Sequence, residues 1–169
     1  RYYLQNFHFQ TDGWLSEDSA NLYDTQVETL FAGTADAMRR QALVPISEYM
    51  NERDQRDVSL LDIACGTGRF MREVKRNWPR AGVTALDLSP DYLAKTKRAL
   101  SKWGRARFVN APAERMPLEK ASQDIVTATY LFHELPPKVR RQVADEIARV
   151  LKPGGRFLLV DALQTDEHP

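Results

Sequence analysis

The stretch VSLLDIACGTGRF, residues 58–70, decides how this chain folds. Its apolar run from Val58 to Ala64 is typical of a strand buried on both faces of a parallel sheet. Gly66 and Gly68 follow at once, and they permit a tight turn that lets the backbone approach a ligand closely. A helix begins after such a turn, and its first N–H groups favour a carboxylate or phosphate. The stretch therefore predicts a strand, a ligand-binding turn and a helix.

Downstream of this stretch, apolar strand patterns alternate with helical ones. Ser89-Pro90 predicts a helix start, since a hydroxyl N-cap precedes a proline in the first turn. The segment Lys152–Gly155 predicts a turn. This alternation predicts an α/β fold, Rossmann-like and doubly wound, with a mainly parallel sheet and helices on both faces. We expect strands at 58–64, 83–87, 107–109, 124–130 and 156–161, and helices at 70–78, 89–102 and 138–151.

Residues 1–57 differ from the rest, and we predict that they form an N-terminal helical cap or lid over a core at 58–169. Apolar residues spaced three and four apart predict two helices in this segment. Pro45 is expected to kink or split the second helix. An aromatic-rich start would make a lid apolar, although packing on the sheet is an equal alternative. The residues that carry these patterns are Phe7, Phe9 and Trp14, then Ala20, Tyr23, Val27 and Leu30, and lastly Ala35, Met38, Ala42, Ile46 and Met50.

Composition excludes several classes of protein. The chain has 169 residues, a formal charge of +1 and 43% hydrophobic residues, which is too apolar for a disordered protein. No apolar run approaches the ~20 residues that cross a bilayer, so we expect no integral membrane association. The basic stretch at 92–113 is expected to be a solvated face, and no nucleic-acid partner is expected. Cys65 is alone and suits a reducing, cytoplasmic location, and the three scattered histidines argue for no metal site.

Asp87 ends the second predicted strand, where a carboxylate can accept both hydroxyls of a ribose. A dinucleotide fingerprint would also need a third glycine, and Met71 stands at that place. A dinucleotide-dependent oxidoreductase is therefore the less favoured interpretation of this ribose site.

Three motifs follow one another along the chain: LLDIACGTGRF at 60–70, ALDLSP at 85–90 and LKPGGRF at 151–157. Together they resemble the class I S-adenosylmethionine-dependent methyltransferases, and most closely the branch with the ubiquinone and menaquinone biosynthesis C-methyltransferases. The resemblance covers residues 58–161. It implies S-adenosylmethionine as cofactor. In that family the sheet continues with a helix and an antiparallel strand pair, so we expect that this strand pair is missing and that the core is truncated after its fifth strand.

The resemblance also implies roles for individual residues. The loop amides and Asp62 would hold the charged ends of the methionine moiety, Asp87 would hold the ribose, and Thr129 would lie near the sulfonium. Pro112 stands where the family has an acidic residue for adenine, so Ala113 would keep a backbone contact and Asn110 or Glu114 would substitute for the acid. The full predicted cofactor set is Asp62, Ala64, Gly66, Gly68, Asp87, Leu88, Asn110, Ala113, Glu114 and Thr129.

Residues after the fourth strand are candidates for catalysis. His133 or Glu134 would act as a general base if the nucleophile arrives protonated. Tyr130 would face the positive sulfur through its ring. A helix-start or packing role is the alternative for each of them. Methyl transfer otherwise needs mainly placement of the nucleophile in line with the methyl group and exclusion of water.

These observations predict an S-adenosylmethionine-dependent methyltransferase that methylates a small, apolar or aromatic metabolite by in-line displacement. A non-catalytic binding or scaffold protein of the same fold is the alternative. The identity of the acceptor, the methylated atom and the oligomeric state carry no signal in the sequence.

Overall fold

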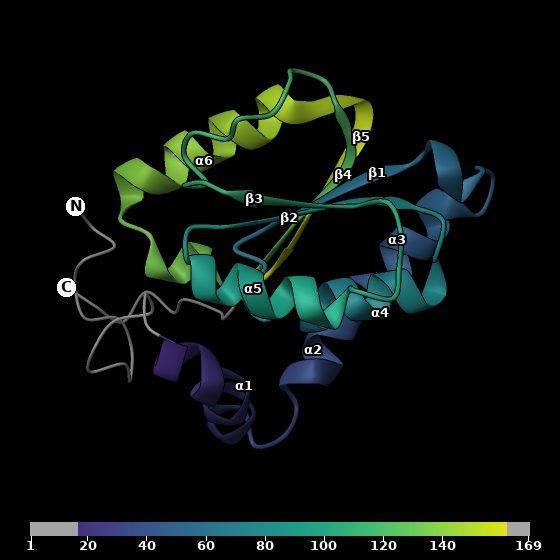
Figure 1. Cartoon of the computed structure of the whole chain (residues 1–169). Coiled ribbons are helices and arrows are strands. Elements are labelled where there is room, and N and C mark those ends of the chain that lie inside the picture. Colours follow the sequence, from purple (N-terminus) through teal and green to yellow (C-terminus); the bar gives the residue numbers. More distant parts are fainter. Residues whose placement is uncertain (1–16, 162–169) are drawn as a thin grey trace.

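The computed structural model describes the backbone of residues 17–161 and the side chains of residues 24–161, so the aromatic start with Phe7, Phe9 and Trp14 lies outside the described residues. Within this range the strands form one parallel sheet in the order β3-β2-β1-β4-β5 (Figure 1). The α/β, Rossmann-like prediction is thereby confirmed. The strands are β1 Ser59–Ile63, β2 Gly82–Asp87, β3 Ala106–Asn110, β4 Gln123–Thr129 and β5 Leu151–Val160.

Helices cover both faces of the sheet because side chains alternate along each strand. On β1, Leu61 and Ile63 pack in one apolar cluster with Val143 of α6. Leu60 packs in a second apolar cluster, which contains Ile46 of α3 and apolar residues of α4. No helix within residues 17–161 combines the length and apolar character that crossing a bilayer requires. The helices are α1 Glu17–Leu30, α2 Ala35–Gln41, α3 Leu43–Met50, α4 Arg69–Asn77, α5 Pro90–Ala99 and α6 Pro137–Val150, with 3-10 turns η2 Gln55–Asp57 and η3 Phe132–Glu134.

Local signals in the sequence place the helix starts well. The Ser89 hydroxyl accepts the N–H of Tyr92 at 3.4 Å and caps α5, which ends at Ala99 rather than near residue 102. The second N-terminal helix is split as predicted, because α2 ends before Ala42 and Pro45 falls in the first turn of α3. A proline in the first turn removes no hydrogen bond, because the N–H groups there have no acceptor within the helix.

The fifth strand differs from its prediction. Leu151 already pairs with β4 opposite Gln123, and the ladder resumes at Arg156 opposite Ile125, so the predicted turn lies inside the strand as an irregularity. Gly155 is required at this irregularity, because a Cβ there would lie 2.9 Å from the carbonyl oxygen of Asp124. The strand therefore begins earlier than its apolar pattern indicated.

The N-terminal segment does not behave as one unit. Residues 43–50 in α3 belong to the apolar core beneath the sheet, where Ile46 and Met50 are buried. The helices α1 and α2 lie outside that core, against α5 and α4 (Figure 1). We use the name cap for residues 17–41, because these are the residues that lie beside the turn after β1.

Candidate functional site

The turn after β1 is the centre of the site. Gly68 is the N-cap of α4 and has a φ of +79°, a conformation that favours glycine. A Cβ on Gly68 would also lie 2.9 Å from the Thr96 side chain of α5. The Thr96 hydroxyl donates to the carbonyl of Gly66 at 2.7 Å, so α5 holds the turn from one side. The neighbouring Cys65 is buried, and burial raises the pKa of its thiol well above the usual value, as suits a packing residue.

Asp87, at the end of β2, bonds to this turn. Its Oδ2 accepts the Gly66 N–H at 2.8 Å and its Oδ1 accepts the Ser89 N–H at 2.9 Å. The side chain is buried, and burial raises the pKa of Asp87 to about 6, against the opposing effect of the backbone hydrogen bonds. A carboxylate offers about four acceptor positions, so these two bonds leave acceptor capacity for a ligand hydroxyl.

A second buried carboxyl, Asp62, lies one strand away. Its Oδ1 accepts the Thr127 hydroxyl at 2.6 Å. Burial, with a smaller contribution from the charge of Asp87, raises the pKa of Asp62 to about 7 against the opposing effect of the Thr127 hydrogen bond. Two carboxyls with raised pKa values at the carboxyl ends of β1 and β2 are typical of a functional site. Ala64, between them in the chain, has a φ of +54°.

The predicted adenine side is built around Asn110. Its Nδ2 donates to the backbone carbonyls of Asp87 at 3.0 Å and Leu88 at 2.7 Å. Because these bonds fix the amide orientation, Oδ1 is the atom that Asn110 can offer to an exocyclic amine. Ala113 is buried and Glu114 is half-buried in the loop that follows β3. The structure brings this loop to the same edge as Asp87, and its adenine role stays a prediction.

The end of β4 supplies the other predicted residues. The hydroxyl oxygen of Thr129 is buried and has no hydrogen-bond partner among the described residues. The ring of Tyr130 stacks on Phe31 of the cap, with 5.0 Å between centroids, and its hydroxyl donates to the Ala35 carbonyl at 3.4 Å. The Arg39 guanidinium lies 5.4 Å from the same ring centroid. Tyr130 thus contacts the cap, and its predicted place beside a sulfonium stays a prediction.

His133 lies in η3, and its ring is held between two carboxylates. Nδ1 pairs with Asp161, and Nε2 lies 3.1 Å from Oε1 of Glu134. Hydrogen bonding to Asp161, and then to Glu134, raises the pKa of His133 to about 9. At neutral pH the ring therefore holds both protons. This charge state makes His133 a hydrogen-bond donor, and action as the predicted general base would first require loss of a proton.

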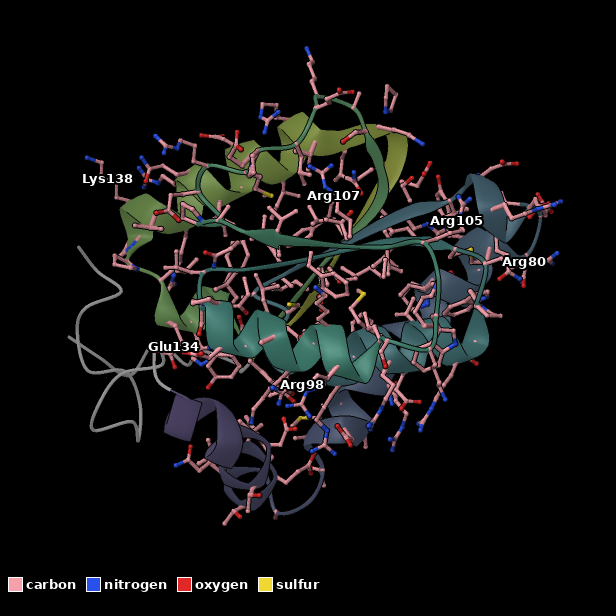
Figure 2. All side chains as sticks on the ribbon, in the orientation of Figure 1. Arg80, Arg98, Arg105, Arg107, Glu134 and Lys138 are labelled. Atoms are coloured by element: carbon pink, nitrogen blue, oxygen red, sulfur yellow. The ribbon has the colours of Figure 1, made fainter. Side chains whose placement is uncertain are left out.

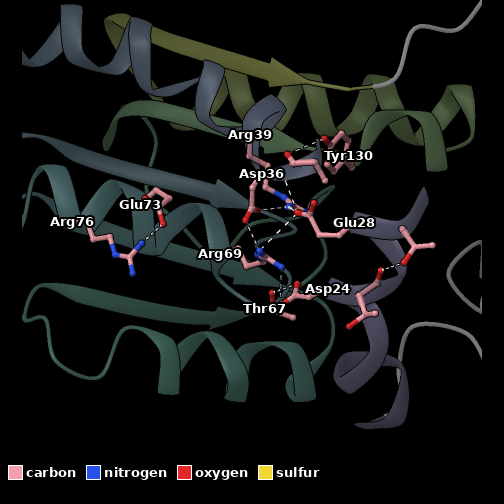
Figure 3. Close-up of polar contacts among 12 residues, drawn as sticks. Asp24, Glu28, Asp36, Arg39, Thr67, Arg69, Glu73, Arg76 and Tyr130 are labelled. Atoms are coloured by element: carbon pink, nitrogen blue, oxygen red, sulfur yellow. Dashed lines mark hydrogen bonds and ion pairs between the residues drawn. The ribbon is translucent and has the colours of Figure 1, made fainter. Parts of the chain in front are cut away.

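Sequence reasoning missed the ionic network that joins the cap to the start of α4 (Figure 3). Arg69, next to Gly68, pairs with Asp36 and lies 3.9 Å from Asp24 and 3.8 Å from Glu28. The hydroxyl of Thr67, in the turn itself, donates to Asp24 at 2.8 Å. The excess of acidic residues near the start of the chain was the signal for this network.

The remaining candidates lie away from this edge. Arg105 and Arg107 of the basic stretch are exposed at the start of β3, at the opposite edge of the sheet, and Arg98 is exposed on α5 (Figure 2). No group of three His, Cys, Asp or Glu side chains within the described range could hold a metal ion.

Similarity to known proteins agrees with this geometry. Residues 60–155 match a family model described as a methyltransferase domain. The chain is 38% identical over 114 residues to a ubiquinone/menaquinone biosynthesis C-methyltransferase of Methylobacterium nodulans, with 66% of this chain and 44% of the relative covered. It is 33% identical over 147 residues to a malonyl-[acyl-carrier protein] O-methyltransferase of Halalkalibacterium halodurans, with 83% and 50% covered. It therefore spans half or less of these curated relatives.

A solved structure has the same fold. The crystal structure of a SAM-dependent methyltransferase from Aquifex aeolicus matches 74% of this chain and 68% of its own, with a TM-score of 0.59 and 18% identity. At that identity the likeness supports the fold alone.

Proposed function

The chain belongs to the methyltransferase domain family, and from this premise we propose that it transfers the methyl group of S-adenosylmethionine to a small, apolar or aromatic metabolite. The observation that carries the proposal is the pairing of the Asp87 carboxylate with the Gly66 N–H of the glycine turn at 2.8 Å. This pairing supports the proposal because it joins a buried carboxylate, which can accept ribose hydroxyls, to a turn whose N–H groups can hold a charged amino-acid end.

The residues at this edge fit S-adenosylmethionine. Asp87 has acceptor capacity beyond its backbone hydrogen bonds, as a ribose hydroxyl requires. The hydroxyl of Thr129 is buried without a partner among the described residues, as expected of a group that a ligand satisfies. Asp62 would hold the amino group, and Asn110 Oδ1 or Glu114 would accept from adenine. Met71, where a dinucleotide site has its third glycine, is fully buried in the core and opposes the oxidoreductase alternative.

S-adenosylmethionine, when bound, supplies a methyl group that its sulfonium already activates. The protein's own part is then to hold the acceptor in line with that group and to exclude water. The cap contributes to the exclusion of water, because its ion pairs and the Thr67–Asp24 hydrogen bond hold α1 and α2 beside the turn. Orientation of this kind contributes ~7–11 kcal/mol toward lowering a barrier.

An apolar or aromatic acceptor is supported by the side chains after β4. Tyr130 and Phe31 stack there, and the Phe132 ring lies 6.0 Å from that of Phe157, centroid to centroid. The relative named for ubiquinone and menaquinone biosynthesis is compatible with such an acceptor. We also propose that the protein acts in the cytoplasm, because its single cysteine suits a reducing compartment. We further propose that its substrate is a small molecule rather than nucleic acid.

Two measurements test this function. Calorimetric titration with S-adenosylhomocysteine should show binding at one site, whereas NADH should give no heat. Transfer of a labelled methyl group should then appear with at least one member of a panel of quinols, phenols and fatty acids. Absence of heat with S-adenosylhomocysteine would refute the cofactor assignment. Binding without transfer across the panel would favour the non-catalytic scaffold.

A further inference from the structure

Asp161, directly after β5, organises the loop that follows β4. Its Oδ2 accepts the backbone N–H of Phe132 at 2.7 Å and that of His133 at 3.3 Å. Its Oδ1 pairs with Nδ1 of the His133 ring. One carboxylate therefore holds both the backbone and the ring of His133, which fixes the direction of the opposite ring nitrogen, Nε2.

Nε2 of His133 faces a second carboxylate. Oε1 of Glu134 lies 3.1 Å away, and a quarter of the Glu134 side chain is exposed. Arg140 of α6 is a further charged neighbour, which donates to the His133 carbonyl at 3.4 Å, and Tyr130 directly follows β4. The two carboxylates dominate, and the pKa of the ring is raised to about 9. His133 is thus a fixed imidazolium whose Nε2–H meets a partly exposed counter-ion.

This cluster follows the carboxyl ends of β4 and β5, and in the parallel sheet these lie at the same edge as the ends of β1 and β2. Thr129 pairs with Val160 in the ladder, and the Tyr130 N–H donates to the Val160 carbonyl at 2.8 Å. Asp161 follows Val160 directly, and His133 lies three residues after Tyr130. The cluster of Asp161, His133 and Glu134 therefore follows the carboxyl ends of β4 and β5, and Thr129 is the last residue of β4.

We propose, on the basis of the methyl-transfer function above, that Asp161 is a positioning residue that aims the His133 imidazolium at the methyl acceptor, and that this acceptor is a phenol or enol bound as its oxygen anion. The arrangement separates two tasks between two side chains. Glu134 removes the proton, and His133 stabilises the charge that removal leaves.

Proton transfer from the acceptor to Glu134 conserves atoms and charge. The O–H bond of the acceptor breaks, its proton goes to the Glu134 carboxylate, and its electron pair stays on the acceptor oxygen. That oxygen takes over the Nε2–H hydrogen bond that neutral Glu134 gives up, while His133 keeps both of its protons. Glu134 returns the proton to solvent through its exposed side. The anion then carries the electron pair that forms the bond to carbon as the methyl–sulfur bond breaks, with the pair of that bond left on sulfur.

The test uses 4-nitrophenol as a probe, because its anion absorbs visible light. The full chain is saturated with S-adenosylhomocysteine, and the affinity and ionisation of bound 4-nitrophenol are measured against pH. We expect the anion to bind about tenfold more tightly than the neutral phenol. H133Q and D161N should abolish that preference, D161E should restore part of it, and E134Q should retain or increase it, since a competing counter-ion is removed.

Asp145→Asn is the matched control, because Asp145 is an exposed aspartate on α6. Nitrogen-15 NMR of the histidine rings adds a second readout, in which D161N should lower the pKa of His133 while D145N leaves it unchanged. Equal affinity for both forms of the probe, no probe binding, or an anion preference that survives in both H133Q and D161N would overturn the proposal. Failure of S-adenosylhomocysteine to bind would instead refute the proposed function.

Discussion

The Oδ2 atom of Asp87 lies 2.8 Å from the backbone nitrogen of Gly66, and this bond joins the end of β2 to the turn after β1. The two residues are 21 positions apart in the chain, and a parallel pair of strands brings them to one edge. The carboxylate thus holds the conformation of the turn before any ligand arrives, and its remaining acceptor capacity is what we propose for the ribose hydroxyls.

Asp87→Ala should weaken binding of S-adenosylhomocysteine by ~1.5–3 kcal/mol, the cost of losing hydrogen bonds to a charged acceptor. Titration calorimetry measures this loss. D145N, which removes an exposed carboxylate on α6, should bind as the parent does. An unchanged affinity in D87A would refute the assigned ribose role.

Gly68→Ala should destabilise the fold by ~2–4 kcal/mol, because the new Cβ combines an unfavourable φ with a 2.9 Å approach to Thr96. Gly33→Ala isolates the first of these effects, since Gly33 has a φ of +80° and nothing within 4 Å of the added carbon. We expect G33A to cost ~1 kcal/mol. Urea unfolding compares the two variants, and equal losses would show that the contact with α5 is unimportant.

Asp62→Asn should stabilise the protein in a pH-dependent manner. The pKa of Asp62 is about 7 in the folded chain and 3.8 as the ordinary value, so the folded state keeps a proton that the unfolded state releases. Stability from this group is therefore full below pH 4 and is lost as the pH rises toward 7. The asparagine carries no such penalty and can still accept the Thr127 hydroxyl.

The free energy of unfolding of D62N should exceed that of the parent by ~4 kcal/mol at pH 8, and the difference should shrink toward pH 4. Denaturant unfolding at four pH values measures the trend. Titrations shared by both proteins cancel in this difference. A difference that does not vary with pH would contradict the assigned ionisation.

Arg69→Gln should loosen the cap, because Arg69 joins α4 to Asp24, Glu28 and Asp36 (Figure 3). We expect opening of residues 24–41 to become easier by ~1–2 kcal/mol, with little change for β1 and β4. Hydrogen exchange of the cap amides reports this directly. Arg76→Gln is the matched control on the same helix, since Arg76 pairs only with the nearby Glu73 among the residues that the structure describes. Equal exchange in the two variants would argue against an ionic role in closure.

The sequence predicted the features that depend on neighbouring residues. Apolar runs identified all five strands of the described sheet, and Ser89-Pro90 marked the start of α5, because burial and capping depend on residue types at short spacing. Gly66, Gly68 and Asp87 were expected at one place for a similar reason, since the ends of parallel strands share one edge, and the Gly66–Asp87 bond shows that they meet there, while their cofactor role stays a prediction. The start of β5 was wrong, because an irregular segment interrupts its pattern.

Tertiary structure decided the charge state and the partners of the site residues. Asp161 and His133 are 28 positions apart, and Arg69 and Asp36 are 33 apart, so nothing in local spacing predicts either pair. The raised pKa values of Asp62 and Asp87 likewise come from burial in the folded chain. Periodicity and turn chemistry are properties of adjacent residues, whereas hydrogen bonds and desolvation across the edge of the sheet exist only once β1, β2, β4 and β5 lie side by side.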